Sequence, residues 1–260
     1  MRARSYRPTR SLQCVADATA IRRAAEPGAE QLDQLIFGEV FEALEIQGDW
    51  AWGRARRDGY VGWVATADLA AEVLRPTHRV SAIRTYAFPA PDLKVPHDLL
   101  LTLNALVTVE AEDGRWVKIA RGGWVPAHHL ADFAAFERDP VAVAERYLGS
   151  PYQWGGRDSV GVDCSGLVQQ ALYACGRGCP RDADMQERET GAEIDPGPDF
   201  GALRRGDLVF WKDHVALMLD GERIIHANGF HAQVAVELLA DAVARNRASG
   251  MGEPTGFRRL

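Results

Sequence analysis

The 260-residue sequence predicts an α+β domain preceded by two small β-barrels. Three observations support this fold class. Residues 1–135 contain a faint internal repeat of short strand patterns separated by Gly and Asp turns, as in small barrels. Residues 136–260 contain helix patterns followed by three strand-like runs, which is typical of an α+β domain. A content of 47% hydrophobic and 25% charged residues is ordinary for a soluble globular chain.

Composition and the N-terminal residues argue against several classes of protein. The formal net charge of −6 argues against a nucleic-acid-binding protein, because such proteins need a basic face. The start, MRARSYRPTRSLQCVADATA, has no continuous apolar segment, and no run approaches the ~20 apolar residues of a membrane span. Four cysteines in a chain of this length do not suggest a disulfide framework. We therefore expect a cytoplasmic protein with reduced thiols and no nucleic-acid or membrane partner; the oligomeric state is left open.

The internal repeat has a period of about 60 residues and occurs only twice, which indicates two tandem modules and not a solenoid. In each copy an Ala-Ile-Arg strand start, at Ile21 and Ile83, precedes a loop, an apolar strand and a Gly-x-Trp turn. Each copy then closes with Gly-Trp-Val, at Trp63 and Trp124. The tryptophans are expected in the barrel cores, because each has apolar neighbours in a strand pattern.

This repeat resembles the bacterial SH3-like (SH3b) domain, whose closing signature is Gly-Trp-Val followed by a short polar segment. The resemblance implies SH3b domain 1 over residues 1–75 and SH3b domain 2 over residues 76–135. The segment EVLRPTHRV, which contains Pro76, is the expected joint between them.

Two helix starts stand out after residue 136. RDPVAVAERYLG has Asp139 as N-cap, Pro140 at the first helical position and Gly149 just past the end. GVDCSGLVQQALYACG, residues 161–176, predicts an amphipathic helix with Asp163 as N-cap and Gly176 as its stop. Strand-like runs then follow at GDLVFW, HVALMLDGERIIHANG and AVELL.

Cys164 lies in the first turn of that second helix. There the backbone N–H groups lack intrahelical partners and the helix dipole favours negative charge by about 0.3–1 kcal/mol. This position is expected to lower the thiol pKa and to favour the nucleophilic thiolate, and the same N–H groups could bind an oxyanion. A small buried core cysteine is the alternative, which the helix considered alone favours.

A base and a residue that orients it are expected at His214 and His226, on either side of Asp220-Gly221. A two-residue loop at 220–221 would place the two histidines on opposite faces of the sheet. A three-residue loop at 219–221, with Gly221 in the left-handed conformation of a G1 bulge, would set them directly across from each other on one face. We predict the second register. For either histidine taken alone, the alternative is an ordinary hydrogen-bonded strand residue.

The motifs YQWGGRDSVGVDCSGLVQQAL, PRDADMQ, LRRGDLVFW, HVALML and IIHANG closely resemble the NlpC/P60 cysteine peptidases, in the family's order. The resemblance covers essentially all of residues 136–260. It implies a papain-like peptidase domain over residues 136–260, with the cysteine at a helix start and the histidine on the sheet that follows.

The resemblance also implies four catalytic residues. Cys164 becomes the nucleophile, and His214 the general base and then the acid. His226 becomes the third polar residue, which fixes the imidazole of His214. Tyr152 matches a tyrosine whose hydroxyl supplements the oxyanion hole in the family; a packed aromatic residue with a hydrogen-bonded hydroxyl is the alternative.

Three further residues match substrate-binding positions of relatives that carry SH3b domains. Asp163 and Ser165 match residues that bind the free amine of an N-terminal L-Ala, and Asp163 can also serve as N-cap. Tyr60, in RDGYVGWV, matches an SH3b tyrosine that reaches toward the peptidase cleft in those relatives. An exposed barrel tyrosine is the alternative.

By resemblance, the expected activity is that of a cysteine endopeptidase or dipeptidyl-peptidase. The expected substrates are short murein tripeptides and tetrapeptides with a free L-Ala, imported during peptidoglycan recycling and cleaved between γ-D-Glu and the diamino acid. The alternatives are a wall-peptide-binding protein without catalysis and an acyltransferase on the same fold. The first SH3b module would limit the length of the peptide.

No cofactor or metal is expected. Cys175 and Cys179 lack the partners of a zinc site, and GGRDSVG lacks the Lys-Ser/Thr of a phosphate loop.

Overall fold

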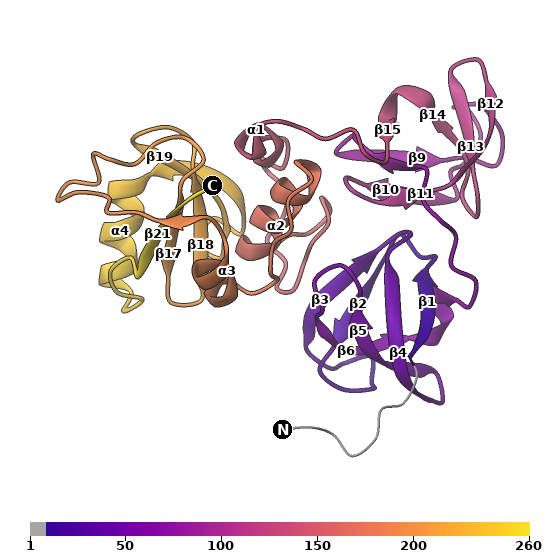
Figure 1. Ribbon diagram of the computed structural model, residues 1–260, viewed down its shortest axis with the longest axis horizontal. Helices are drawn as coiled ribbons and strands as arrows, with labels where there is room; N and C mark the ends of the chain where they lie inside the picture. Colours follow the sequence, from indigo (N-terminus) through magenta and orange to yellow (C-terminus); the bar gives the residue numbers. More distant parts are fainter. Residues whose placement is uncertain (1–8) are drawn as a thin grey trace. The chain divides into compact units, whose positions relative to one another are not determined.

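The computed structural model describes residues 9–260, and the chain divides into two compact units, Met1–Ala135 and Phe136–Leu260 (Figure 1). Residues 1–8, part of the N-terminal stretch that has no continuous apolar segment in the sequence, lie outside the described residues. Within residues 9–260, no helix combines the length and the apolar composition needed to cross a bilayer. The expected cytoplasmic location stays a prediction.

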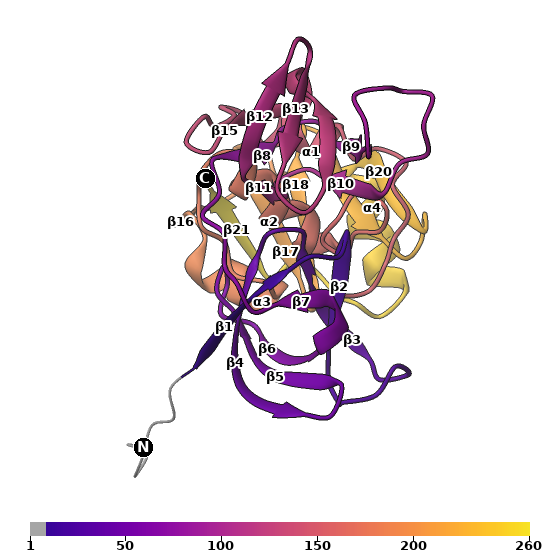
Figure 2. The same ribbon diagram turned by 90° about the vertical axis from the view of Figure 1, so that its right-hand side faces the viewer.

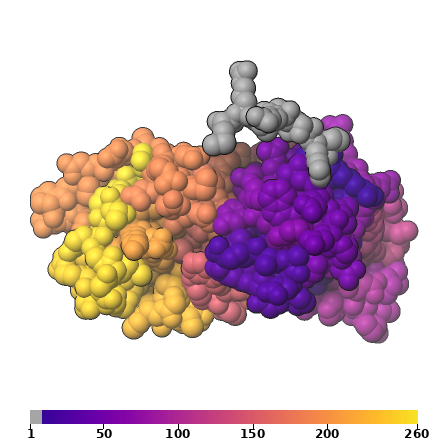
Figure 3. Space-filling model, turned by 90° about the horizontal axis from the view of Figure 1, so that it is seen from below, coloured from indigo at the N-terminus to yellow at the C-terminus, as the bar shows by residue number. Residues whose placement is uncertain are grey.

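Residues 10–70 form one antiparallel sheet of seven strands, in the order β3-β2-β6-β5-β4-β1-β7. The strands are β1 (Arg10–Cys14), β2 (Ala18–Arg22), β3 (Gln31–Ile36), β4 (Val40–Gln47), β5 (Trp50–Ala55), β6 (Val61–Ala65) and β7 (Leu69–Ala70). Alternate side chains point inward and form a core that includes Ile21, Leu35, Phe41 and Val64. Part of the surface of this SH3-like region appears in indigo and purple in Figure 3.

Residues 78–132 form three small sheets around one core instead of a single continuous sheet. Their strands are β8 (His78–Val80), β9 (Arg84–Ala87), β10 (Leu99–Thr102), β11 (Leu106–Val107), β12 (Val109–Asp113), β13 (Trp116–Ile119), β14 (Gly123–Pro126) and β15 (Leu130–Asp132). The paired strands β12 and β13 are seen side by side in Figure 2. Trp116 is buried, whereas Trp124 is only partly buried. A second closed barrel over residues 76–135 therefore stays a prediction.

The second unit contains four helices, and both predicted N-caps are confirmed. They are α1 (Pro140–Glu145), α2 (Cys164–Ala174), α3 (Ala183–Glu189) and α4 (Leu239–Ala248). The Asp139 carboxylate accepts the N–H of Val141 at 2.9 Å, and the Asp163 carboxylate accepts the N–H of Gly166 at 2.7 Å. The helix α1 ends at Glu145, earlier than the sequence pattern suggested.

The helix α2 ends where Gly176 takes a φ of 72°, as expected for a C-terminal stop. The expected amphipathic pattern is wrong, however, because all eleven residues of α2 are buried. The polar residues Ser165, Gln169 and Gln170 are buried along with the apolar ones. A helix enclosed in this way can hold a side chain at its first turn in a fixed position.

The second unit is built on an antiparallel sheet of six strands, in the order β16-β21-β17-β18-β19-β20. The strands are β16 (Ala192–Glu193), β17 (Leu208–Trp211), β18 (His214–Met218), β19 (Arg223–Asn228), β20 (Gln233–Leu238) and β21 (Gly256–Arg259). Ala216, Met218 and Ile224 pack against α4 on one face of the sheet. Figure 1 shows α4 on one side of the sheet and α2 on the other. Neither α4 nor β21 was predicted from the sequence.

The predicted register of β18 and β19 is wrong by two residues. Leu217 pairs with Ile225 and Met218 with Ile224, so the turn consists of residues 220–222. Gly221 does not adopt a positive φ. Instead, the carboxylate of Asp220 accepts the N–H groups of Glu222 and Arg223 and stabilises the turn. Because the shift is by two residues, the histidines still share a face, as predicted.

Candidate active site

Cys164 begins α2 and lies against the backbone on either side of His214. Its Sγ is 4.0 Å from the carbonyl oxygen of Asp213 and accepts a hydrogen bond from the N–H of Val215. Asp213 adopts a positive φ of 60° directly before β18, at the point where the chain turns into the strand. The structure therefore brings the predicted nucleophile and the start of the predicted base strand together.

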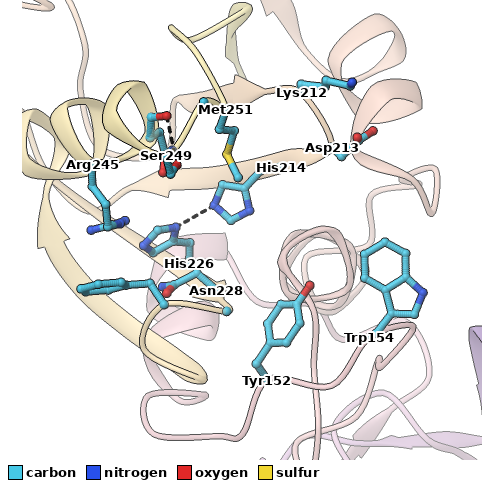
Figure 4. A pocket seen from close by; sticks show the side chains of 14 residues that line it. Tyr152, Trp154, Lys212, Asp213, His214, His226, Asn228, Arg245, Ser249 and Met251 are labelled. Atoms are coloured by element: carbon cyan, nitrogen blue, oxygen red, sulfur yellow. Dashed lines mark hydrogen bonds between the residues drawn. The ribbon is translucent and has the colours of Figure 1, made fainter.

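His214 and His226 are joined by a hydrogen bond of 2.8 Å between Nε2 of His214 and Nδ1 of His226 (Figure 4). Continuing the register of the Leu217–Ile225 and Met218–Ile224 pairs along the strands sets His214 opposite Asn228, so that His226 is its diagonal neighbour. Both imidazoles are buried. The bond predicted between the two rings is present, although it forms along the diagonal and not directly across the ladder.

A third member of this row, Glu237 of β20, was not predicted from the sequence. Ile224 pairs with Glu237, which places Glu237 one diagonal step from His226 on the same face. Nε2 of His226 lies 2.7 Å from Oε1 of Glu237. Arg245 of α4 binds both oxygens of that carboxylate, with Nη2 at 2.6 Å from Oε1. The sequence AVELL predicts an ordinary strand. Glu237 could have been identified as a site residue only from the pairing of this strand with the strand that carries His226.

Both predicted proton-transfer partners are neutral in the resting site. Burial raises the pKa of the Cys164 thiol to about 12, and the Asp163 carboxylate adds to the rise, whereas the N–H of Val215 and the cation of Arg181 oppose it. Burial, with repulsion from His226 and Arg245, lowers the pKa of His214 to about 3, and Glu237 opposes this.

The expectation of a lowered cysteine pKa is therefore wrong. A thiol pKa of about 12 in place of 9.0 disfavours the thiolate by about 4 kcal/mol. A helix N-terminus contributes only about 0.3–1 kcal/mol in the other direction. Desolvation of the enclosed sulfur thus outweighs the helix dipole.

Asp163 is the centre of a buried polar network at the start of α2. Its Oδ2 accepts the N–H of Gly155 at 2.9 Å and Nη2 of Arg181 at 2.6 Å. Its Oδ1 accepts the N–H of Gly166, Nη1 of Arg181 at 3.0 Å and the hydroxyl of Ser165 at 3.3 Å. Five donors thus already surround the carboxylate that was predicted to bind a substrate amine.

Arg181 and Gln186, for which the sequence suggested no role, complete this network. Nη1 of Arg181 donates to the hydroxyl of Ser165 at 2.8 Å. Nε2 of Gln186, in α3, donates to the carbonyl oxygen of Ser165 at 2.9 Å. The segment PRDADMQ therefore fixes the residues on both sides of Cys164.

Tyr152 and the histidines line one cavity of about 620 Å³. Figure 4 shows the Tyr152 hydroxyl pointing into this cavity. Burial, followed by the proximity of Cys164 and Asp163, raises the pKa of Tyr152, so that the hydroxyl remains a proton donor. Trp154 and Phe230 also line the cavity, with 58% and 71% of their surface exposed. The cavity has the size of a small-molecule or peptide site.

Tyr60, the remaining predicted residue, is partly buried against the core of the sheet formed by residues 10–70. Its backbone N–H donates to the Asp58 carboxylate at 3.0 Å, and its carbonyl accepts the N–H of Ala55. It is thus part of the packing of this sheet. A role in substrate binding stays a prediction.

One group of side chains has the composition of a metal site. His226, His231 and Glu237 have ligand atoms within 4.8 Å of one another. However, Arg245 already binds both oxygens of Glu237, and His226 contacts the same carboxylate. The ligand atoms of His226 and Glu237 are therefore engaged in hydrogen bonds, and the guanidinium of Arg245 disfavours a second cation.

Comparison with known proteins gives matches in both units. Residues 21–69 match the family described as the bacterial dipeptidyl-peptidase Sh3 domain, and residues 149–252 match the NlpC/P60 family. A solved structure of an NlpC/P60 family protein from Bacillus cereus has a TM-score of 0.81 at 19% identity, covering 96% of this chain and 99% of that one. This similarity shows a common fold.

Two relatives align with most of the chain. Dipeptidyl-peptidase 6 of Lysinibacillus sphaericus is 26% identical over 232 residues, which are 78% of this chain and 83% of the relative. Gamma-D-glutamyl-L-lysine dipeptidyl-peptidase of Bacillus subtilis is 25% identical over 239 residues, 81% of this chain and 76% of the relative. The chain therefore contains an SH3 domain of the dipeptidyl-peptidase type followed by an NlpC/P60 cysteine peptidase domain of papain-like fold, and it is homologous to dipeptidyl-peptidases.

Proposed function

We propose that this peptidase cleaves short cell-wall peptides at the bond between γ-D-Glu and the diamino acid, with Cys164 as nucleophile and His214 and His226 as its partners. The observation that carries the proposal is the position of Cys164 Sγ beside the backbone of His214, whose Nε2 is bonded to His226. The names of the two relatives, a dipeptidyl-peptidase and a gamma-D-glutamyl-L-lysine dipeptidyl-peptidase, support the substrate class.

The reaction starts from a neutral thiol and a neutral imidazole. As Sγ of Cys164 attacks the carbonyl carbon, the thiol proton moves to Nδ1 of His214, the nitrogen not engaged with His226. The C–N bond then breaks, His214 returns the proton to the leaving amine, and a thioester remains on Cys164. Water next gives a proton to His214 and attacks the thioester, and the departing sulfur takes the proton back.

The oxyanion formed in each step needs hydrogen-bond donors. The backbone N–H at the start of α2 is one source, because the first turn has no intrahelical acceptors. The hydroxyl of Tyr152 is the second, since its raised pKa keeps it protonated. A single such donor typically contributes about 10²–10³-fold to kcat.

A free N-terminal amine would have to compete for Asp163 with five hydrogen bonds that its carboxylate already accepts. A substrate ammonium would have to share this carboxylate with Arg181. Acetylating the amine of L-Ala-γ-D-Glu-L-Lys removes the charge and leaves the scissile bond unchanged. If Asp163 binds the amine, we expect kcat/KM to fall by at least about 10-fold, which is the effect of ~1.4 kcal/mol.

The test is incubation of the full-length protein with L-Ala-γ-D-Glu-L-Lys, its meso-diaminopimelate counterpart and the acetylated forms, with products identified by mass spectrometry. Release of L-Ala-γ-D-Glu and the free diamino acid is expected. Equal rates on free and acetylated peptides would remove the amine-recognition step only. Binding without product would favour a peptide-binding protein, and transfer of the dipeptide to an added amine would favour an acyltransferase.

The pH profile of kcat/KM should not fall near pH 6.5, where an ordinary histidine base becomes protonated. His214 must be neutral to accept a proton, so activity is lost as the pH falls through its pKa in the free enzyme. Burial, His226 and Arg245 lower that pKa to about 3 against the opposing charge of Glu237. We expect kcat/KM to stay level from about pH 7 to about pH 5. An acid limb near the ordinary histidine value of about 6.5 would contradict this.

A further inference from the structure

The row of polar residues does not end at the second histidine. His214, His226 and Glu237 lie on one face of three successive strands, each one diagonal step from the next. The helix α4 packs on this face and supplies Arg245 to the far end of the row. Together these four side chains form a hydrogen-bonded chain, which we call the relay: His214, His226, Glu237 and Arg245.

The direction of the hydrogen bonds along the relay is set from its far end. Arg245 can only donate, and an ionised carboxylate can only accept. Burial by itself would raise the pKa of Glu237, but the hydrogen bonds from His226 and Arg245 lower it to about 2, so the carboxylate is ionised. The nitrogen of His226 that faces Glu237, Nε2, must therefore carry the proton.

The state of His226 then fixes that of His214. Burial lowers the pKa of His226, although Glu237 acts in the opposite direction, and a neutral imidazole has a single N–H. With its proton on Nε2, His226 can only accept at Nδ1. The 2.8 Å bond therefore requires a proton on Nε2 of His214. A lone pair is left on Nδ1 of His214.

That lone pair is on the correct nitrogen for the thiol. Nδ1 is the ring nitrogen nearer the main chain of its own residue, and Sγ of Cys164 lies against the main chain at Asp213 and Val215. Figure 4 shows that the second ring nitrogen of His214 faces away from His226. In the opposite tautomer, Nδ1 would carry a proton and could not accept another.

We propose that Glu237, held by Arg245, is a positioning residue that selects the tautomers of both histidines and so keeps Nδ1 of His214 free to accept a proton. The inference deepens the proposed function and rests on it for the role of His214. Cζ of Arg245 also lies 4.5 Å from the centroid of the exposed Phe230 ring, and this cation–π contact helps to keep the arginine in place.

The test compares wild type with Glu237→Gln in the full-length protein labelled with ¹⁵N at histidine. Ring nitrogen shifts distinguish protonated from unprotonated nitrogens, and single histidine substitutions assign the signals. In wild type we expect the Nε2–H form at both His214 and His226. Glutamine presents a donor as well as an acceptor to His226, so the Nδ1–H form should appear at both residues together.

The same variant should lose about 10–100-fold in kcat with little change in KM, because the tautomer affects proton transfer and not peptide binding. Glu253→Gln is the matched control, since Glu253 pairs with Arg247 of the same helix but lies on the surface. We expect kcat and histidine shifts of this control to equal those of wild type. Glu237→Asp keeps the carboxylate and should retain the wild-type tautomers, which separates tautomer selection from loss of folding.

An Nδ1–H form of His214 in wild type, or unchanged tautomers and kcat in Glu237→Gln, would overturn the inference. Neither ¹⁵N shifts nor the rate of Cys164 alkylation by iodoacetamide requires a peptide substrate. The two proposals can fail separately. If the wall peptides are not cleaved, but Glu237→Gln changes the ¹⁵N shifts of both histidines and slows the alkylation of Cys164, the proposed substrate is wrong and the positioning role of Glu237 stands.

Discussion

Replacing Cys164 by alanine is expected to remove peptide cleavage entirely, a loss of about 10⁶-fold in kcat. The reason is chemical, because the variant has no atom that can form the thioester. The substitution should leave α2 intact, since alanine is a good helix former and Sγ makes only weak contacts with Asp213 and Val215. Product release from L-Ala-γ-D-Glu-L-Lys, followed by mass spectrometry, measures the effect.

Cys175→Ala provides the matched control, because Cys175 is a second cysteine, at the C-cap of the same helix. We expect it to cleave at the wild-type rate. Binding should survive in Cys164→Ala, so that saturating peptide still raises its melting temperature. Cleavage by Cys164→Ala at a rate near that of wild type would remove the nucleophile assignment and leave the histidines without a function in peptide hydrolysis.

Local sequence signals were sufficient to predict the helix ends, which depend only on neighbouring residues. Asp139 and Asp163 cap their helices through their own side chains, and Gly176 ends α2 with a positive φ. The prediction that His214 and His226 share a face came from the choice of a three-residue turn, and the observed turn also has three residues. These features follow from short-range geometry, which a sequence pattern records directly.

Features that depend on the register of distant strands were not predictable. The turn between β18 and β19 is set by hydrogen bonds to Asp220, and not by a left-handed Gly221. With this turn, the residue opposite His214 is displaced by two positions from the predicted His226. The position of Glu237 depends in turn on the register of β19 with β20, and Arg245 arrives from a helix that the sequence analysis did not identify.

Burial caused the largest error about the site. The cysteine was predicted to be activated by the helix end, but the sequence does not reveal that all of α2 is enclosed. Desolvation destabilises the thiolate by more free energy than the helix dipole contributes in its favour. Burial also keeps His214 neutral by lowering its pKa. The resulting pair can exchange a proton only as the sulfur attacks, which makes the tautomer of His214 more important than its pKa.

Arg181→Met should destabilise the second unit by about 3–5 kcal/mol, because it removes one member of a buried ion pair. The side chains of Arg181 and Asp163 are 2% and 9% exposed and meet at 2.6 Å. Without the guanidinium, Asp163 keeps only its backbone donors and Ser165, and the negative charge stays buried beside Cys164. Urea unfolding, followed by the fluorescence of the seven tryptophans, measures the loss.

Arg188→Met is the control for this prediction, since Arg188 pairs with Asp184 on the surface of α3, with the side chains 60% and 58% exposed. Its loss should cost no more than about 0.5 kcal/mol. In the double variant Asp163→Asn with Arg181→Met, the uncompensated charge is absent, and asparagine can still cap α2. The double variant should therefore be more stable than Arg181→Met alone, with a coupling energy of about 1–3 kcal/mol. Equal stability of Arg181→Met and wild type would show that the network around Asp163 does not hold the start of α2, and the fixed position of the thiol would then need another cause.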